Sequence, residues 1–231
     1  MHRWDSGRPV APDWAAGPRE PQDKERRSIP WELGLLAAAL VLVALQSLGG
    51  PGGPPQPEHA GTALSSEYGA GAEHVAAAPM PASPPLRVRI PAIDVDAPVM
   101  DLAIEDSGRL ASPPEGDPDL AGWWARGPAP GTRGTAVMAG HVDIPTGPAV
   151  FYDLGALKLG MSVRVLRADG STAHFTIDSI DVYSAADFPD HKVYADTGRP
   201  EIRLITCGGG FDRKRQRYEG NVVVSAYLTT S

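Results

Sequence analysis

The chain has 231 residues, a formal net charge of −7 at pH 7, 21% charged residues and one cysteine. The acidic balance argues against a nucleic-acid binder, which would need a basic surface. A single cysteine excludes a disulfide scaffold and a cysteine-rich zinc module, and the 42% hydrophobic content suits one globular domain with extensions.

The N-terminal region reads as a tail followed by a membrane anchor. Residues 1–28 are polar, rich in arginine and without an apolar period, which predicts a disordered cytoplasmic tail. An apolar run within residues 29–50 reaches the length of about 20 residues that spans a bilayer. Arg26 and Arg27 precede it and the next basic residue is Arg87, so we expect a single-pass anchor with the following domain outside the cell. A cleaved signal peptide and a buried core helix are the alternatives.

Residues 51–85 are rich in glycine, proline and alanine. They contribute much of the chain's 26 glycines and 24 prolines. This composition predicts a linker, partly flexible and partly polyproline-like, that holds the next domain away from the membrane.

From residue 86 to residue 231 the pattern changes to short strands. The Asp169–Gly170 turn separates two of these strands and predicts a hairpin. Residues 149–158 suggest a short helix and residues 185–188 a turn. Many short strands with glycine and proline turns are typical of a sandwich or barrel, so we expect a mostly β domain. The predicted strands are residues 87–90, 135–142, 162–167, 172–177, 201–207 and 221–228.

The lone Cys207 follows an apolar run and directly precedes Gly208–Gly210. It is either a small buried hydrophobe or a reactive thiol. Its position at an expected strand end, beside glycines that let a ligand approach, favours the thiol. A reactive thiol needs a neighbouring base. His141 also follows an apolar strand, so both side chains can meet on one rim of the domain.

These motifs resemble the sortase family, over most of residues 86–231. The residues that carry the likeness are Arg89–Val95, Gly140-His141, Val150–Leu154, Leu159–Val163 and Leu204–Cys207. Details that look most like the actinobacterial class F branch (class E/F) are Leu120–Trp124, Ala139–Asp143, Cys207–Gly209 and Phe211–Arg213.

The resemblance implies a closed eight-stranded β-barrel with short helices, and a membrane-anchored cysteine transpeptidase. Such an enzyme cleaves a sorting signal of the Leu-Pro-x-Thr-Gly type, holds the acyl group as a thioester and passes it to a cell-wall amine. On this mapping Cys207 is the nucleophile and His141 the general acid/base. The third residue of the family is an arginine. We assign Arg213, with Arg217 as the alternative, because Asn221 stands where the better-known class A pattern has its arginine.

The expected substrate groove has the loop of residues 184–200 as its wall. No EF-hand spacing is present, and we expect neither a metal nor a cofactor. Asp143 is interpreted as a turn residue. The alternative is that its carboxylate orients the ring of His141. The residues expected to contact substrate are Thr206, Gly208, Asn221, Phe188 and Val193.

The resemblance also implies the partners and the location. The donors would be surface proteins with a C-terminal sorting signal, the acceptor an amine of a peptidoglycan precursor or wall peptide, and the location the cell membrane. Two other hypotheses remain open. One is an enzyme similar to L,D-transpeptidases, although Ile205-Thr206-Cys207 departs from the Ser-x-Gly-Cys stretch expected there. The other is a non-catalytic extracellular β-domain with an inert cysteine.

Overall fold

The computed structural model describes residues 53–57 and 77–230. The predicted tail (1–28) and anchor (29–50) lie outside these residues. Within the described ranges, no helix combines the length and the hydropathy that a membrane crossing requires.

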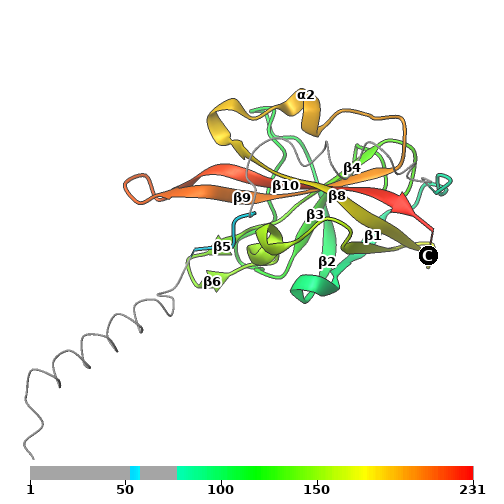
Figure 1. Ribbon diagram of the computed structural model, residues 1–231, viewed down its shortest axis with the longest axis horizontal. Coiled ribbons are helices and arrows are strands. Elements are labelled where there is room, and N and C mark those ends of the chain that lie inside the picture. The colour runs from blue at the N-terminus through cyan, green and yellow to red at the C-terminus, as the bar shows by residue number, and fades with distance from the viewer. Residues whose placement is uncertain (1–52, 58–76, 231) are drawn as a thin grey trace, which may run out of the picture. The chain divides into compact units, whose positions relative to one another are not determined.

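Eight strands close into a barrel in the order β1-β2-β3-β4-β9-β10-β8-β7, with β7 pairing back to β1 (Figure 1). In this order every barrel strand has a paired neighbour on each side over part of its length. The expected mostly β fold and closed eight-stranded barrel are therefore confirmed. The strands are β1 (Pro85–Ile90), β2 (Val95–Leu102), β3 (Ala121–Trp124), β4 (Thr135–Ala139), β7 (Ser162–Arg167), β8 (Thr172–Ser184), β9 (Glu201–Asp212) and β10 (Arg217–Thr229).

The remaining elements are short and lie in the connections. The helix expected over residues 149–158 is a five-residue 3-10 helix, and the turn expected at residues 185–188 is another. The full set of elements outside the barrel consists of the paired strands β5 (Asp143–Ile144) and β6 (Gly147–Pro148), the 3-10 helices η2 (Pro91–Ile93), η3 (Tyr152–Ala156) and η4 (Ala185–Asp187), and the helix α2 (Asp190–Val193).

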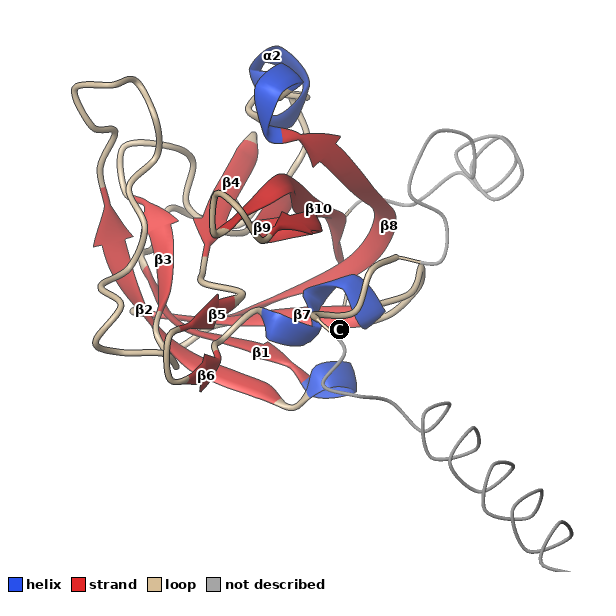
Figure 2. Cartoon of the chain, turned by 90° about the vertical axis from the view of Figure 1, so that its left-hand side faces the viewer, coloured by secondary structure: helices blue, strands red, loops and turns tan. Residues whose placement is uncertain are grey.

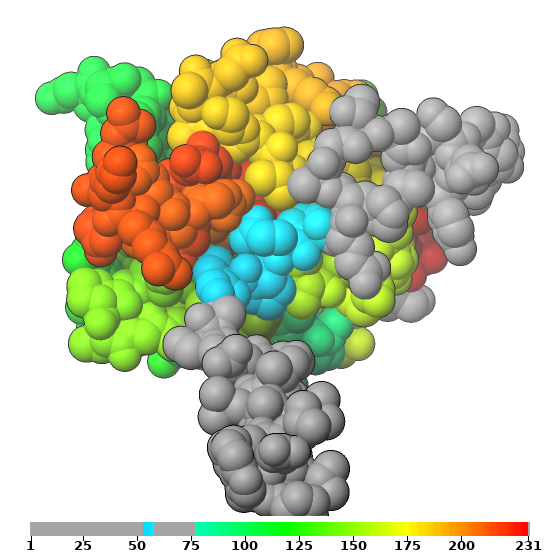
Figure 3. All heavy atoms as spheres, turned by 60° about the vertical axis from the view of Figure 1, so that its left-hand side comes forward, coloured from blue at the N-terminus to red at the C-terminus, as the bar shows by residue number. Residues whose placement is uncertain are grey.

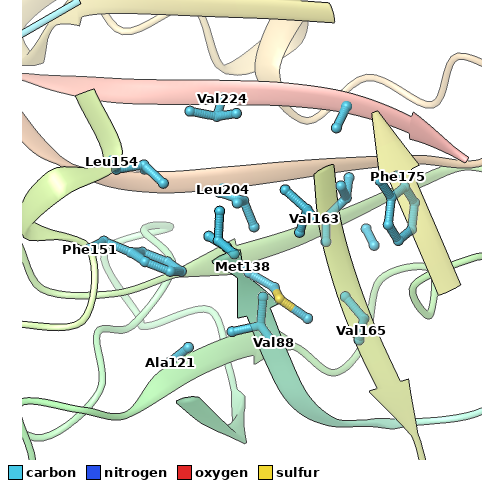
Figure 4. Packing of buried hydrophobic residues seen from close by; sticks show 14 of the residues in the cluster. Val88, Ala121, Met138, Phe151, Leu154, Val163, Val165, Phe175, Leu204 and Val224 are labelled. Carbon is cyan, nitrogen blue, oxygen red and sulfur yellow. The ribbon is translucent and has the colours of Figure 1, made fainter. Parts of the chain in front are cut away.

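Alternation along the strands builds the core inside the barrel. On β7, Val163 and Val165 are buried while Arg164 between them is exposed. Successive side chains of a strand point to opposite faces, so the apolar set of each strand faces the interior. Figure 4 shows these side chains meeting those of Met138, Leu204 and Val224 from the strands opposite.

Two barrel strands have no clear signal in the sequence. The β2 sequence carries Pro98 and two aspartates, and β3 is only four residues long. Proline and aspartate are depleted in strands, so local preference argues against β2. Pairing with β1 on one side and β3 on the other holds it in the sheet.

Parts of the expected linker pack against the barrel. The backbone N–H of Met80 donates to the carbonyl of Gly131 at 2.8 Å, and the Oγ of Ser83 accepts from the N–H of Asp169 at 3.1 Å. Residues 53–57 also lie on this surface, between the orange β9–β10 hairpin and the yellow-green residues before β7 (Figure 3). The packed unit thus includes residues 53–57 and 77–85, all inside the range whose composition predicts a linker.

Candidate active site

Cys207 lies in the middle of β9 and not at its end, which corrects the sequence prediction. β9 continues to Asp212 because β10 pairs with it on one side over almost its whole length. On the other side, the parallel pairing with β4 stops at Ala139 opposite Ile205. Cys207 is exposed just past the point where β9 loses its β4 neighbour. The strands β4, β9 and β10 lie next to one another in Figure 2.

His141 lies beside this open edge. The N–H of Gly140 donates to the carbonyl of Ile205 at 3.1 Å, which continues the pairing one residue past β4. The hydroxyl of Thr206 donates to the carbonyl of Gly140 at 2.9 Å. Extending this parallel alignment by two residues from Ala139 opposite Ile205 places the backbone of His141 alongside that of Cys207.

The loop between β2 and β3 fixes the imidazole of His141. Its Nε2 lies 2.7 Å from the carbonyl oxygen of Pro113. A carbonyl oxygen only accepts hydrogen bonds, so we assign the ring proton to Nε2 in the neutral side chain. The lone pair that can take up a proton is then on Nδ1.

Three influences set the pKa of the Cys207 thiol. Removal of water by the surrounding protein raises the pKa, although the residue as a whole is exposed, and the carboxylate of Asp143 raises it further. The charge of Arg109 acts in the opposite direction. The net shift is upward, so the resting side chain is a protonated thiol, which needs a base as it attacks.

The two predicted arginines lie at the far end of the β9–β10 hairpin. Arg213 is exposed in the turn at the tip of the β9–β10 hairpin, where its carbonyl accepts a hydrogen bond from Gln216 Nε2 at 2.7 Å. Arg217 begins β10 opposite Asp212, closer to Cys207 but also exposed. Arg213 is six positions after Cys207, and its role as the third active-site residue stays a prediction.

Arg109 comes from the loop between β2 and β3, where the sequence predicts no site residue. This loop also supplies Pro113 and Leu110, and Leu110 packs against the outer apolar cluster beside Cys207. The charge of Arg109 acts on both Cys207 and Tyr194. The local sequence does not indicate that Arg109 acts on the thiol, since Arg109 lies almost a hundred positions before Cys207.

An apolar wall stands on the outer face of the barrel beside Cys207. Ile205, two residues before the cysteine, packs with Val137, Val193 and Val223. Phe188 and Tyr194 extend this cluster, with ring centroids 6.2 Å apart. The loop that follows β8 thus supplies part of this apolar cluster, and its role as the wall of a substrate groove stays a prediction.

The predicted substrate contacts divide into inward and outward residues. Thr206 is 3% exposed and is bonded to Gly140, and a Cβ on Gly208 would lie 2.6 Å from Val222 Cγ2. Val193 is 2% exposed and supports the wall from within. These three residues are buried in packing positions, and their contact with substrate stays a prediction.

Asn221 and Phe188 are the predicted contacts that the structure leaves accessible. Asn221 lies directly opposite Cys207 in the β9–β10 pair and is half-buried. Phe188 is half-buried in the wall, with its ring 6.0 Å from that of Tyr183. No group of three or more potential metal ligands occurs in the described part of the chain.

Asp143 is more than the turn residue that the sequence suggested. It begins β5, two residues after His141, and its Oδ2 accepts a 2.5 Å hydrogen bond from the hydroxyl of Tyr218 on β10. The sequence gives no sign of this pairing, because the two residues are 75 positions apart.

Comparisons with known proteins identify one family. A family model described as the sortase domain matches residues 88–229. No curated protein matches the chain. Among solved structures, sortase A from Corynebacterium diphtheriae is 20% identical over 64% of this chain, with a TM-score of 0.49. The chain spans only 62% of the length of that protein.

Two further solved structures have similar scores. Sortase C-1 from Actinomyces oris is 21% identical over 63% of this chain and 73% of its own, with a TM-score of 0.48. A Clostridium perfringens sortase D5 transpeptidase is 19% identical over 62% of this chain and 78% of its own, with a TM-score of 0.46.

Proposed function

Since this chain belongs to the sortase family, we propose that it is a cysteine transpeptidase in which Cys207 is the nucleophile and His141 the general acid/base. The observation that carries the proposal is the alignment of these two residues at the edge where β9 separates from β4. A thiol and an imidazole from adjacent strands can pass a proton between them.

The first half-reaction forms a thioester. The Cys207 thiol gives its proton to His141 as the sulfur attacks the carbonyl carbon of a peptide bond. His141 then protonates the departing amine, the carbon–nitrogen bond breaks and the acyl group stays on sulfur. A base is required because the pKa of Cys207 is raised and little thiolate is present beforehand. The hydrogen bond to Pro113 holds the ring in one orientation during this transfer.

The second half-reaction passes the acyl group to an amine. The incoming amine attacks the thioester carbonyl, His141 takes up a proton, and the carbon–sulfur bond breaks. Water competes for the same thioester. The apolar wall that contains Phe188 and Tyr194 lowers access of water from that side and favours transfer over hydrolysis.

A cation is needed near the oxyanion that forms in both steps. We assign this role to Arg109, because its charge acts on the Cys207 thiol in the free protein. Arg213, favoured by the sequence because its Phe-Asp-Arg context directly follows the glycines, is the alternative. Alanine variants at both positions decide between them: the variant at the true cation loses most thioester formation and keeps its fold.

The finer parts of the proposal concern substrate and location. The donor is a surface protein with a sorting signal of the Leu-Pro-x-Thr-Gly type, and the acceptor is a cell-wall amine. The enzyme is of the class F type, anchored in the cell membrane by residues 29–50 with the barrel outside the cell. Support comes from the motifs Ala139–Asp143 and Phe211–Arg213 and from the apolar run within 29–50.

A peptide cleavage assay tests the proposed activity. The full chain is incubated with fluorogenic peptides that carry variants of Leu-Pro-x-Thr-Gly, and the acyl-enzyme is detected by intact-protein mass spectrometry. We expect cleavage and an adduct on Cys207. Cys207→Ala, which should fold because the position is exposed, is expected to abolish both. An adduct at another residue, or no cleavage of any peptide in the series, would contradict the proposal.

A further inference from the structure

The carboxylate of Asp143 has a place in the site that the first half-reaction does not explain. It lies two residues after His141 and accepts the Tyr218 hydroxyl proton at 2.5 Å. It also raises the pKa of Cys207. A negative charge that makes the thiolate harder to form works against nucleophile activation, so its use lies elsewhere.

Tyr218 holds this carboxylate in position from the other side of the site. It lies on β10, three residues before Asn221, the residue opposite Cys207. Its ring packs edge-on against Phe211 with centroids 5.0 Å apart. The pKa of Tyr218 is raised by burial and by the hydrogen bond to Asp143. The hydroxyl therefore remains a donor at neutral pH and fixes one oxygen of the carboxylate, Oδ2.

The charge of Asp143 is not neutralised by the protein around it. Asp143 is in none of the ion pairs formed by the residues that the structure describes. It is half-buried. An oriented, half-buried carboxylate without an ion-pair partner can bind a cation from solution.

We propose that Asp143, oriented by Tyr218, binds the protonated primary amine that attacks the thioester on Cys207. This inference rests on the proposed function and adds the location of the acceptor site. At neutral pH a primary amine is mostly an ammonium ion. Its positive charge and its three N–H donors make it a good partner for a carboxylate. Bound there, it lies next to both His141 and Cys207.

The step balances in protons and charge. The bound ammonium gives one proton to neutral His141, and the free amine attacks the thioester carbonyl carbon. The carbon–nitrogen bond forms, the carbon–sulfur bond breaks, and the second proton passes from nitrogen to the departing sulfur. The products are an amide, the Cys207 thiol and an imidazolium that returns its proton to solvent.

The partition of the acyl-enzyme tests this site independently of how fast the acyl-enzyme forms. The full chain is acylated with a cleavable peptide in the presence of diglycine, and the ratio of amide to hydrolysed product is measured. Asp143→Asn is expected to lower this ratio about tenfold, as loss of one charged hydrogen bond predicts. Tyr218→Phe is expected to lower it less, because the carboxylate remains but is no longer oriented.

Two controls complete the design. Hydroxylamine is largely uncharged at neutral pH. When it replaces diglycine as the acceptor, the ratio of transfer product to hydrolysed product is expected to be nearly the same in Asp143→Asn as in the wild type. Asp153→Asn removes an exposed carboxylate of η3 and is expected to keep the diglycine ratio. An unchanged diglycine ratio in both Asp143→Asn and Tyr218→Phe overturns the acceptor site while leaving the transpeptidase intact. Absence of any Cys207 adduct in the wild type overturns the proposed function itself.

Discussion

The hydroxyl of Thr206 donates a 2.9 Å hydrogen bond to the carbonyl oxygen of Gly140, and these residues directly precede Cys207 and His141. The bond is buried and connects β9 to the end of β4 at the point where the two strands separate. It therefore connects the two segments that carry Cys207 and His141, the proposed nucleophile and base.

Replacing Thr206 by valine tests this connection. Valine keeps the shape but leaves the Gly140 carbonyl without its partner, which should cost about 1–3 kcal/mol of unfolding free energy. Turnover should fall more than the loss of folded protein explains, because His141 is no longer held in line. Urea denaturation and steady-state kinetics measure the two effects. Thr206→Ser keeps the hydroxyl and should retain most of the wild-type turnover. Equal turnover in the valine and serine variants would contradict the role given to the Thr206–Gly140 hydrogen bond.

The opposing charges of Arg109 and Asp143 should be visible in the ionisation of Cys207. Arg109→Gln removes the charge that lowers the pKa of the thiol, so the pKa should rise. Asp143→Asn removes a charge that raises it, so the pKa should fall. The pH at which alkylation by iodoacetamide reaches half its maximal rate reports the thiolate. Arg164→Gln, an exposed change on β7, is the control; shifts of the same sign in both site variants would refute this account.

The buried carboxylate of Glu201 should matter far more for stability than an exposed one. Glu201 is 2% exposed and pairs with Arg203 at 2.7 Å and with Arg199. Glu201→Gln leaves the buried Arg203 charge uncompensated, and we expect a loss of about 3–5 kcal/mol. Asp96→Asn removes an exposed partner of Arg87 and should have little effect. Chemical denaturation of both variants would show the contrast, and similar midpoints would disprove it.

The contact of residues 53–57 with the barrel can be broken at Gly155. A Cβ at this position would overlap the carbonyl oxygen of Pro55, so Gly155→Ala should displace the segment. The N–H of Gly209, which donates to Gln56 Oε1 at 2.9 Å, should then exchange faster with solvent. Hydrogen exchange measures this directly. Gly116→Ala, with open space around its Cβ, should leave the exchange of Gly209 unchanged.

Much of the barrel can be predicted from alternation alone. β7 and the first half of β8 bury every second residue, and the Asp169–Gly170 turn joins them as expected. The three consecutive valines of β10 are buried on both faces, with Val222 and Val224 in the barrel core and Val223 in the outer cluster. β2 and β3 cannot be predicted in this way, because their place in the sheet comes from their neighbours and not from their own residues.

For the site, the local sequence singles out the thiol and the imidazole as candidates, because each follows an apolar run. That the two runs form adjacent strands is decided by the tertiary structure. The surroundings of the pair depend on the folded barrel. Arg109, Asp143 and Tyr218 come from segments far apart in the chain. The charges of Arg109 and Asp143 act on Cys207, and Tyr218 bonds Asp143, because the fold brings these segments together. Side-chain alternation is local and therefore visible in the sequence, whereas electrostatic contacts between distant segments depend on the register of the folded barrel.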